Sequence, residues 1–194
     1  MSRESDLKVY TIGHSTRSLE EFIELLKIYG VTLLIDIRTA PHSRYNPQFN
    51  KETLPAHLRH YDIKYIHLEA IGGLHRPKTN SINLALKNAS FRGYADYMQT
   101  KEFVAAFLKI IVLAKENQVA LMCAEALPWK CHRNLISDAL VARHIKVLHI
   151  ISREGVIRHV LNEMADVDGN KVTYPLYNKK TPQKMLSDFG SARS

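Results

Sequence analysis

Residues 8–37, KVYTIGHSTRSLEEFIELLKIYGVTLLIDI, carry the signals for a strand, a helix and a second strand, in that order. The first six residues form a short apolar run that ends in glycine. Residues 31–37 are almost continuously apolar, which is typical of a strand buried on both faces of a parallel sheet. Between these runs, Ser18 and Glu21 form a capping-box pair, and apolar residues then recur at helical spacing. A strand–helix–strand unit of this kind predicts a parallel sheet with helices packed on its faces.

The same alternation of strand and helix signals continues through the rest of the chain. The predicted elements are a short helix over 51–60, a strand over 63–68, an irregular stretch through 72–83, a helix after Thr100, a strand over 119–123, a helix containing Leu135 and Leu140, and a strand over 146–151. A weaker helix is predicted over 156–163 and an extended segment over 172–177. We therefore predict an α/β fold: a single three-layer α/β/α domain with a mostly parallel central sheet over residues 1–178, and a loosely held C-terminal tail over 179–194.

The composition is that of an ordinary folded domain with an excess of positive charge. Of the 194 residues, 45% are apolar and 24% are charged, and 27 Lys and Arg against 19 Asp and Glu give a net charge of +8. These values exclude disorder, collagen and coiled coil for the whole chain. No apolar run approaches the ~20 residues that span a bilayer, and the polar N-terminus lacks the apolar segment of a secretory signal. Because two cysteines are too few for a disulfide framework, we expect a soluble cytoplasmic protein without membrane contact. Its oligomeric state stays open.

The loops that follow the predicted strands hold the side chains with the most chemistry. In folds of this class the ligand site lies beyond the carboxyl ends of the strands, so one face is expected to collect these loops. The residues in question are His14 and Ser15, then Arg38, Ser43 and Arg44, then the Gly72–Gly73 pair, and finally Glu125, Cys131, His132 and Arg133.

The segment CAEALPWKCHR, residues 123–133, is the most distinctive of these loops. Pro128 prevents a helix before about residue 129, so Cys131, His132 and Arg133 are expected in the first turn of the next helix. The free N–H groups and the dipole at a helix N-terminus favour an anion and lower the pKa of a thiol. We therefore predict that Cys131, with His132, supplies a nucleophile and that Arg133 binds an anion.

A carboxylate and a second thiol lie in the same segment. Glu125, two residues beyond the strand, is predicted as a general acid or base, and the alternative is a structural salt bridge to Arg38 or Arg133. Cys123 ends the apolar strand and is predicted to be a packing residue. Packing is also the alternative role for Cys131.

Three arginines could form an anion clamp at this edge. Arg38 and Arg44 are six residues apart in one extended loop, and the guanidinium fork suits a carboxylate or a phosphate. Arg133 would complete the clamp. Arg92 and Tyr94 add a further arginine and an aromatic ring, either for stacking on a substrate or for simple packing.

Several familiar motifs are absent. The chain has neither G-x-G-x-x-G nor G-x-x-x-x-G-K-[ST], and neither cysteine is followed by arginine at the spacing of a Cys-x5-Arg phosphatase loop. Zinc could be held by Cys123, Cys131, His132 and a distant His14, but these residues lack the paired short spacings of zinc motifs. Neither a metal nor any other cofactor is therefore predicted.

Five motifs in order resemble the domain-of-unknown-function family 488. They are TIGHSTRSLEEF, LIDIRTAPHSRYNPQF, IKYIHLEAIGG, FRGYADYM and LMCAEALPWKCHR. The resemblance covers roughly residues 10–151, and Thr16 departs from it, since many members carry asparagine there. Because this family is biochemically uncharacterised, the resemblance carries no catalytic assignment, and the roles given above come from residue chemistry.

Two functional hypotheses follow. The first is an enzyme or ligand-binding domain for an anionic small molecule, such as a phosphate, a nucleotide or a modified base; as an enzyme it would be of hydrolase or transferase type. The alternative is a nucleic-acid-binding or DNA-repair-associated module, in which the same arginines meet phosphates and Tyr45, Tyr94 or Trp129 stack on bases.

Overall fold

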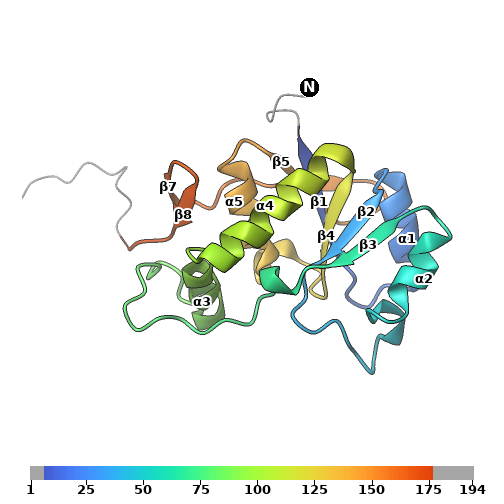
Figure 1. Ribbon diagram of the computed structural model, residues 1–194, viewed down its shortest axis with the longest axis horizontal. Helices are drawn as coiled ribbons and strands as arrows, with labels where there is room; N and C mark the ends of the chain where they lie inside the picture. The colour runs from blue at the N-terminus through green and yellow to red at the C-terminus, as the bar shows by residue number, and fades with distance from the viewer. Residues whose placement is uncertain (1–6, 177–194) are drawn as a thin grey trace, which may run out of the picture.

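A six-stranded sheet forms the centre of the protein (Figure 1). The computed structural model describes residues 7–176. The strands are β1 (Lys8–Gly13), β2 (Leu33–Asp36), β3 (Lys64–His67), β4 (Val119–Cys123), β5 (Lys146–Ile150) and β6 (Val156–Arg158). Their order is β3-β2-β4-β1-β5-β6; the first five in this order are parallel, and β6 is antiparallel to β5. The predicted mostly parallel α/β sheet is thus confirmed.

Within residues 7–176, five α-helices cover the two faces of the sheet. They are α1 (Leu19–Ile28), α2 (Leu54–Arg59), α3 (Ala89–Tyr97), α4 (Lys101–Glu116) and α5 (Arg133–Val141). Neighbouring residues of one strand point to opposite faces, so Ile12 shares a core with Phe22 of α1, whereas Val9 shares the other core with Phe107 of α4. The α1 and α2 side chains lie in the first core and those of α3, α4 and α5 in the second, which makes three layers.

Local capping explains where the helices begin. Ser18 accepts the backbone N–H of Glu21 at the start of α1, and Thr100 accepts that of Phe103 at the start of α4. Helix α3 was not predicted, because it carries a glycine at position 93 and a weak apolar pattern. A Cβ on Gly93 would lie 2.3 Å from the carbonyl oxygen of His75, so this position must stay small for the irregular 72–83 stretch to pass.

The C-terminal part of the chain differs from the prediction. The helix predicted over 156–163 is wrong: Val156 pairs with Ile150, and the segment forms the short edge strand β6. The extended segment predicted over 172–177 begins in β8 (Lys171–Thr173), which pairs with β7 (Asp166–Asp168). The tail predicted over 179–194 lies outside the described residues.

A buried polar network fastens this C-terminal part to α5. The carboxylate of Asp138 accepts hydrogen bonds from His159 Nε2 (2.9 Å), the Asn162 backbone N–H (2.9 Å) and the Tyr174 hydroxyl (2.7 Å). A fourth residue, His149, bonds to His159 at 3.0 Å. Buried polar groups need partners of this kind, so the network sets the position of the chain after β6. Among residues 7–176, no helix is long and apolar enough to cross a membrane.

Candidate functional site

The carboxyl ends of β1, β2 and β4 lie side by side, and the loops that follow them are in contact. The backbone N–H of His14 donates to the Cys123 carbonyl at 3.0 Å, and that of Ile37 donates to the Met122 carbonyl at 3.0 Å. A Cβ on Gly13 would lie 1.9 Å from the Glu125 carbonyl oxygen, so this close approach requires glycine. The expectation that these loops share one edge therefore holds in the structure.

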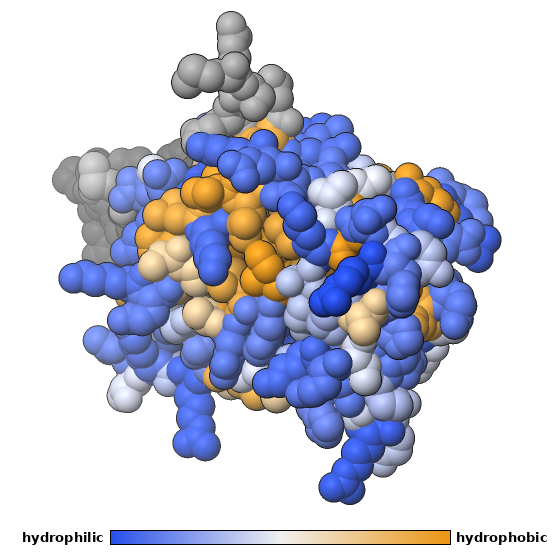
Figure 2. Space-filling view, turned by 45° about the vertical axis from the view of Figure 1, so that its right-hand side comes forward, coloured by the Kyte–Doolittle hydropathy of each residue, from blue (hydrophilic) through white to orange (hydrophobic). Residues whose placement is uncertain are grey.

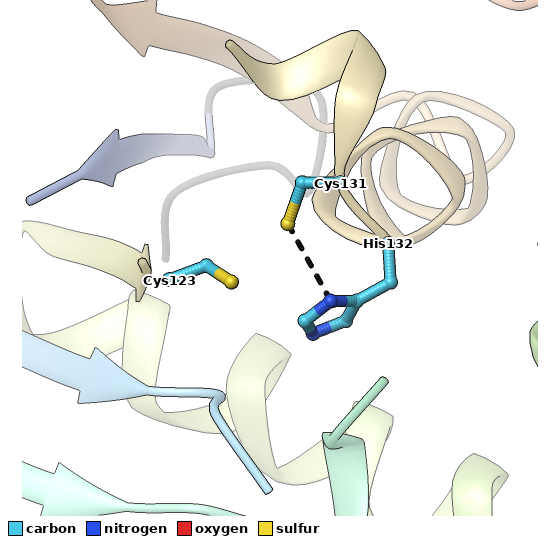
Figure 3. A group of neighbouring side chains, drawn as sticks. All are labelled: Cys123, Cys131 and His132. Carbon is cyan, nitrogen blue, oxygen red and sulfur yellow. Dashed lines mark hydrogen bonds between the residues drawn. The ribbon is translucent and has the colours of Figure 1, made fainter. Parts of the chain in front are cut away.

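Two thiols and an imidazole meet at this edge (Figure 3). Cys123 is the last residue of β4, and the chain returns through the 3₁₀ turn η4 (Pro128–Lys130) to Cys131 and His132. Both Sγ atoms and a ring nitrogen of His132 lie within 4.8 Å of one another, and Cys131 Sγ is 3.5 Å from His132 Nδ1. All three residues are buried. We refer to Cys123, Cys131 and His132 as the thiol–imidazole cluster.

Helix α5 begins later than the sequence predicted. Arg133 is its first residue and His132 is its N-cap, while Cys131 has extended backbone just outside the helix. The expected interaction with the helix start nevertheless exists, because the Arg133 backbone N–H points at Cys131 Sγ with a distance of 3.5 Å. The thiol thus accepts one of the backbone N–H groups at the helix start that have no partner within the helix.

The two thiols have opposite pKa displacements. The pKa of Cys131 is lowered to about 6, first by the hydrogen bond from the Cys123 thiol and then, against the effect of burial, by the positive charge and backbone N–H of Arg133. The pKa of Cys123 is raised to about 12 by that same hydrogen bond and by burial. At neutral pH the pair is therefore one thiolate, on Cys131, held by one thiol, on Cys123.

His132 is held in one tautomer and one orientation. Its Nε2 lies 3.1 Å from the carbonyl oxygen of Ile37, and a carbonyl can only accept, so Nε2 carries the proton. In the neutral ring the lone pair is then on Nδ1, which faces the Cys131 sulfur and accepts the proton of the Cys131 thiol when that proton is present. The backbone of Gly73 passes so close that a Cβ there would lie 2.6 Å from Nδ1, and the Tyr94 ring centroid is 5.1 Å from that of His132.

Arg133 is inside the protein and does not form the predicted solvent-facing anion ligand. It is 1% exposed, and its guanidinium donates to the carbonyl oxygens of Glu125 and Ala126 and to Thr11 Oγ1. The side chain therefore ties α5 to β1 and to the loop after β4. Its charge reaches the cluster only through space, by its effect on the Cys131 thiolate.

Arg38 is also committed to the interior. Its guanidinium binds both carboxylate oxygens of Asp36, at 2.9 and 2.6 Å, and donates to the Phe49 carbonyl and to His14 Nε2. The ring of His14 stacks on that of Phe49 with centroids 4.4 Å apart. Arg44, in contrast, is exposed. The predicted clamp of Arg38, Arg44 and Arg133 is therefore not assembled.

The other predicted site residues have mainly local contacts. Ser15 has a positive φ of 46°, and Ser43 Oγ accepts two backbone N–H groups of its own turn. Glu125 is exposed and forms neither of the predicted salt bridges; its carboxylate lies 3.4 Å from the Leu127 backbone nitrogen. Arg92 donates to the Leu86 carbonyl, and the buried Tyr94 hydroxyl donates to that of Ile71.

The cluster is the arrangement at this edge that could hold a metal ion. Its donor set is two sulfurs and one imidazole nitrogen, which are zinc ligands. His14, the fourth candidate from the sequence, contacts Arg38 and Phe49 instead. The sequence did not predict that the Cys123 thiol interacts with Cys131. A cysteine at the end of an apolar strand has the same sequence context whether its thiol only packs in the core or also donates a hydrogen bond. No signal in the sequence indicates that the Ile37 carbonyl accepts a hydrogen bond from His132.

A groove away from the cluster has a different character. A groove of about 520 Å³ between α4, α5 and the β7–β8 hairpin is lined by Phe103, Leu108 and Val172 among others, and its lining includes no cysteine or histidine. Val104 and Leu108 of α4 are exposed in this groove, and Val112 is exposed further along the same helix. Figure 2 shows apolar side chains gathered on the face that it views.

The fold and the cluster define a class: an α/β protein with two cysteines and a histidine at the carboxyl edge of a parallel sheet. The chain belongs to the family described as "Domain of unknown function DUF488", whose family model matches residues 18–140. That match contains the whole cluster and leaves out Gly13, His14 and Ser15. Neither the curated proteins nor the solved structures give a match.

Proposed function

We propose that this protein is an enzyme that uses the Cys131 thiolate as a nucleophile on an anionic substrate. The observation that carries the proposal is the position of the Cys131 sulfur, 3.5 Å from both His132 Nδ1 and the Arg133 backbone N–H, beside the thiol of Cys123. A thiolate stabilised by a neighbouring donor and a helix start is the form in which cysteine is nucleophilic.

In the proposed reaction, the Cys131 sulfur forms a bond to an electrophilic carbon or phosphorus of the substrate. The bond to the leaving group breaks, and the leaving group departs with the electron pair. When the substrate meets the thiol form, His132 Nδ1 takes the thiol proton, and the Ile37 carbonyl holds the ring in the orientation that this transfer requires. Glu125, exposed on the loop after β4, is the proposed acid or base for the second half of a transfer or hydrolysis.

The substrate is proposed to be an anion because of charge. The chain has a net charge of +8, and Arg44 and Lys130 are exposed on the loops after β2 and β4. Exposed cations near a site raise the local concentration of anionic ligands. The charge of Arg38 is balanced by Asp36, whereas Arg133, which is held by carbonyl and hydroxyl oxygens, contributes positive potential from the interior without contacting the ligand.

The test compares two alkylating reagents that differ in charge. Iodoacetamide is neutral and iodoacetate is an anion, and peptide mass spectrometry reads the rate at each cysteine between pH 4 and 9. We expect half-maximal reaction of Cys131 near pH 6, no reaction of Cys123 below pH 9, and a higher iodoacetate-to-iodoacetamide rate ratio than for free cysteine. Arg44→Ala should lower this ratio. A Cys131 that is inert, or that titrates near pH 9, contradicts the nucleophile; a ratio equal to that of free cysteine contradicts only the anionic substrate.

A second candidate function, nucleic-acid binding, is supported by two exposed aromatic rings. Tyr45 is 94% exposed next to Arg44, and Trp129 is 50% exposed. Such rings can stack on bases while a cation meets phosphate. Anisotropy of a labelled single-stranded oligonucleotide should then show binding that falls steeply between 50 and 200 mM salt, as is typical of phosphate contacts. Absence of binding at low salt eliminates this function.

A further inference from the structure

We propose that Cys123, Cys131 and His132 form a binding site for a thiophilic divalent cation, with Zn²⁺ as the ion of choice. The three residues come from the end of β4 and the start of α5, so the sheet and the helix position them independently of any ligand. Their donor atoms already converge within 4.8 Å.

The distances fit a zinc site. Zinc–sulfur bonds of about 2.3 Å and zinc–nitrogen bonds of about 2.0 Å in a tetrahedron put a sulfur and a nitrogen ligand about 3.5 Å apart, and two sulfurs about 3.8 Å apart. Cys131 Sγ and His132 Nδ1 are separated by 3.5 Å. Because no two of the three donor atoms are more than 4.8 Å apart, side-chain rotations that move each donor atom by about 1 Å would bring the three atoms to these separations.

The hydrogen bonds around the cluster are those that a zinc ligand needs. The Ile37 carbonyl accepts from His132 Nε2 and leaves the Nδ1 lone pair for the metal, and the Arg133 backbone N–H supports the Cys131 sulfur. Such outer contacts fix the tautomer and orientation of ligands. The donor set contains no carboxylate, so it favours zinc over calcium or magnesium.

Burial and charge are compatible with a cation here. The guanidinium of Arg133 opposes a positive ion, but two thiolates supply two negative charges against it. Because zinc binds cysteine as the thiolate, zinc affinity is expected to rise with pH.

Occupancy has a consequence that rests on the proposed function. A zinc ion shares the sulfur lone pair with which Cys131 would attack a substrate, so the loaded protein should be inactive and the metal-free protein active. Three protein ligands also leave one of four positions for an outside ligand, which is the pattern of exchangeable and catalytic zinc rather than of closed structural sites.

The experiment uses the full chain, reduced and treated with chelator, and titrates it with Co²⁺ and then Zn²⁺. We expect a thiolate-to-cobalt charge-transfer band that saturates at about one ion per chain and disappears when zinc displaces cobalt. Cys123→Ser, Cys131→Ser and His132→Ala should each weaken zinc binding by more than about 100-fold, which exceeds the usual effect of losing an outer hydrogen bond. His57→Ala, an exposed histidine on α2, is the control and should bind normally.

A second measurement needs no variant, because wild-type protein can be alkylated at pH 8 with and without one equivalent of zinc. Protection of Cys131 supports the site. Absence of the charge-transfer band, or zinc binding that all three cluster variants retain, overturns it. The metal-free alkylation profile is independent of these results, so the zinc site can fail while the nucleophile stands, and the reverse.

Discussion

Replacing Cys123 with alanine should raise the pKa of the Cys131 thiol by at least about one pH unit, which corresponds to about 1.4 kcal/mol. The wild-type pKa of about 6 lies well below the ordinary 9, and the hydrogen bond from Cys123 is the largest cause of the lowering. Alanine removes the donor while burial, which opposes ionisation, stays. At pH 7 the thiolate fraction should fall from about 0.9 to about 0.5 or less, as the pKa moves from about 6 to about 7 or above.

The assay is the iodoacetamide profile of Cys131, read as the pH of half-maximal rate. The midpoint is preferred to the absolute rate because a thiolate of higher pKa is also intrinsically more nucleophilic. Cys123→Ser is the matched control: its hydroxyl keeps a donor at the same place, so its midpoint should stay within about half a pH unit of wild type. Thermal denaturation of each variant confirms that the reaction is with folded protein.

Two results would refute this reasoning. A Cys123→Ala midpoint that remains near pH 6 would mean that Arg133 and the start of α5 alone hold the thiolate. Equal upward movement in the alanine and serine variants would mean that the sulfur of Cys123 matters through packing and not through its proton.

Three further outcomes follow from the contacts. Asp138→Ala leaves three donors of the buried network without an acceptor and should lower the free energy of unfolding by at least about 3 kcal/mol in a urea titration; an effect under 1 kcal/mol would contradict the network's role. Burial, and next the positive charge of a neighbouring arginine, lower the pKa of His14 to about 4 from an ordinary 6.5. Since the folded pKa is the lower one, stability is full above pH 6.5 and is lost as pH falls toward 4. His14 should account for about 2 kcal/mol of the loss at pH 5, and His14→Gln should reduce the dependence by that amount in urea titrations at pH 7 and 5. Gly73→Ala would push a methyl group against His132 Nδ1 and should weaken zinc binding at least tenfold, whereas Gly155→Ala, with nothing within 4 Å, should not.

Elements whose cause is local could be predicted from the sequence. Ser18 and Glu21 mark the start of α1 because a cap and its partner are close in the chain, and the apolar run before Asp36 marks a buried strand. β6 could not be predicted in this way. Val156 is extended because it pairs with Ile150 of β5. The intrinsic strand propensity of an apolar residue in a short mixed segment is too weak to predict this pairing.

The site shows the same division between local and tertiary causes. Placing Cys131 near the start of a helix followed from Pro128 and the apolar spacing beyond it, and so did the expectation of a thiolate. The burial of Arg38 and Arg133 could not be predicted from the sequence. An arginine in a loop has the same sequence context whether its guanidinium is exposed to solvent or bonded to buried acceptors. Only the packing of the loops supplies Asp36 and the backbone carbonyls that take up both guanidiniums.

By itself, the sequence determined the α/β class, the parallel strands and the edge at which the chemistry gathers, because hydrophobic period and caps act over short stretches of chain. The tertiary structure decided which groups at that edge are available. It buried two of three arginines, turned the Cys123 thiol toward Cys131 and set the His132 lone pair by a carbonyl 95 residues away. Hydrogen bonds between distant segments depend on angles and distances of less than an ångström, and these exist only once the layers have packed.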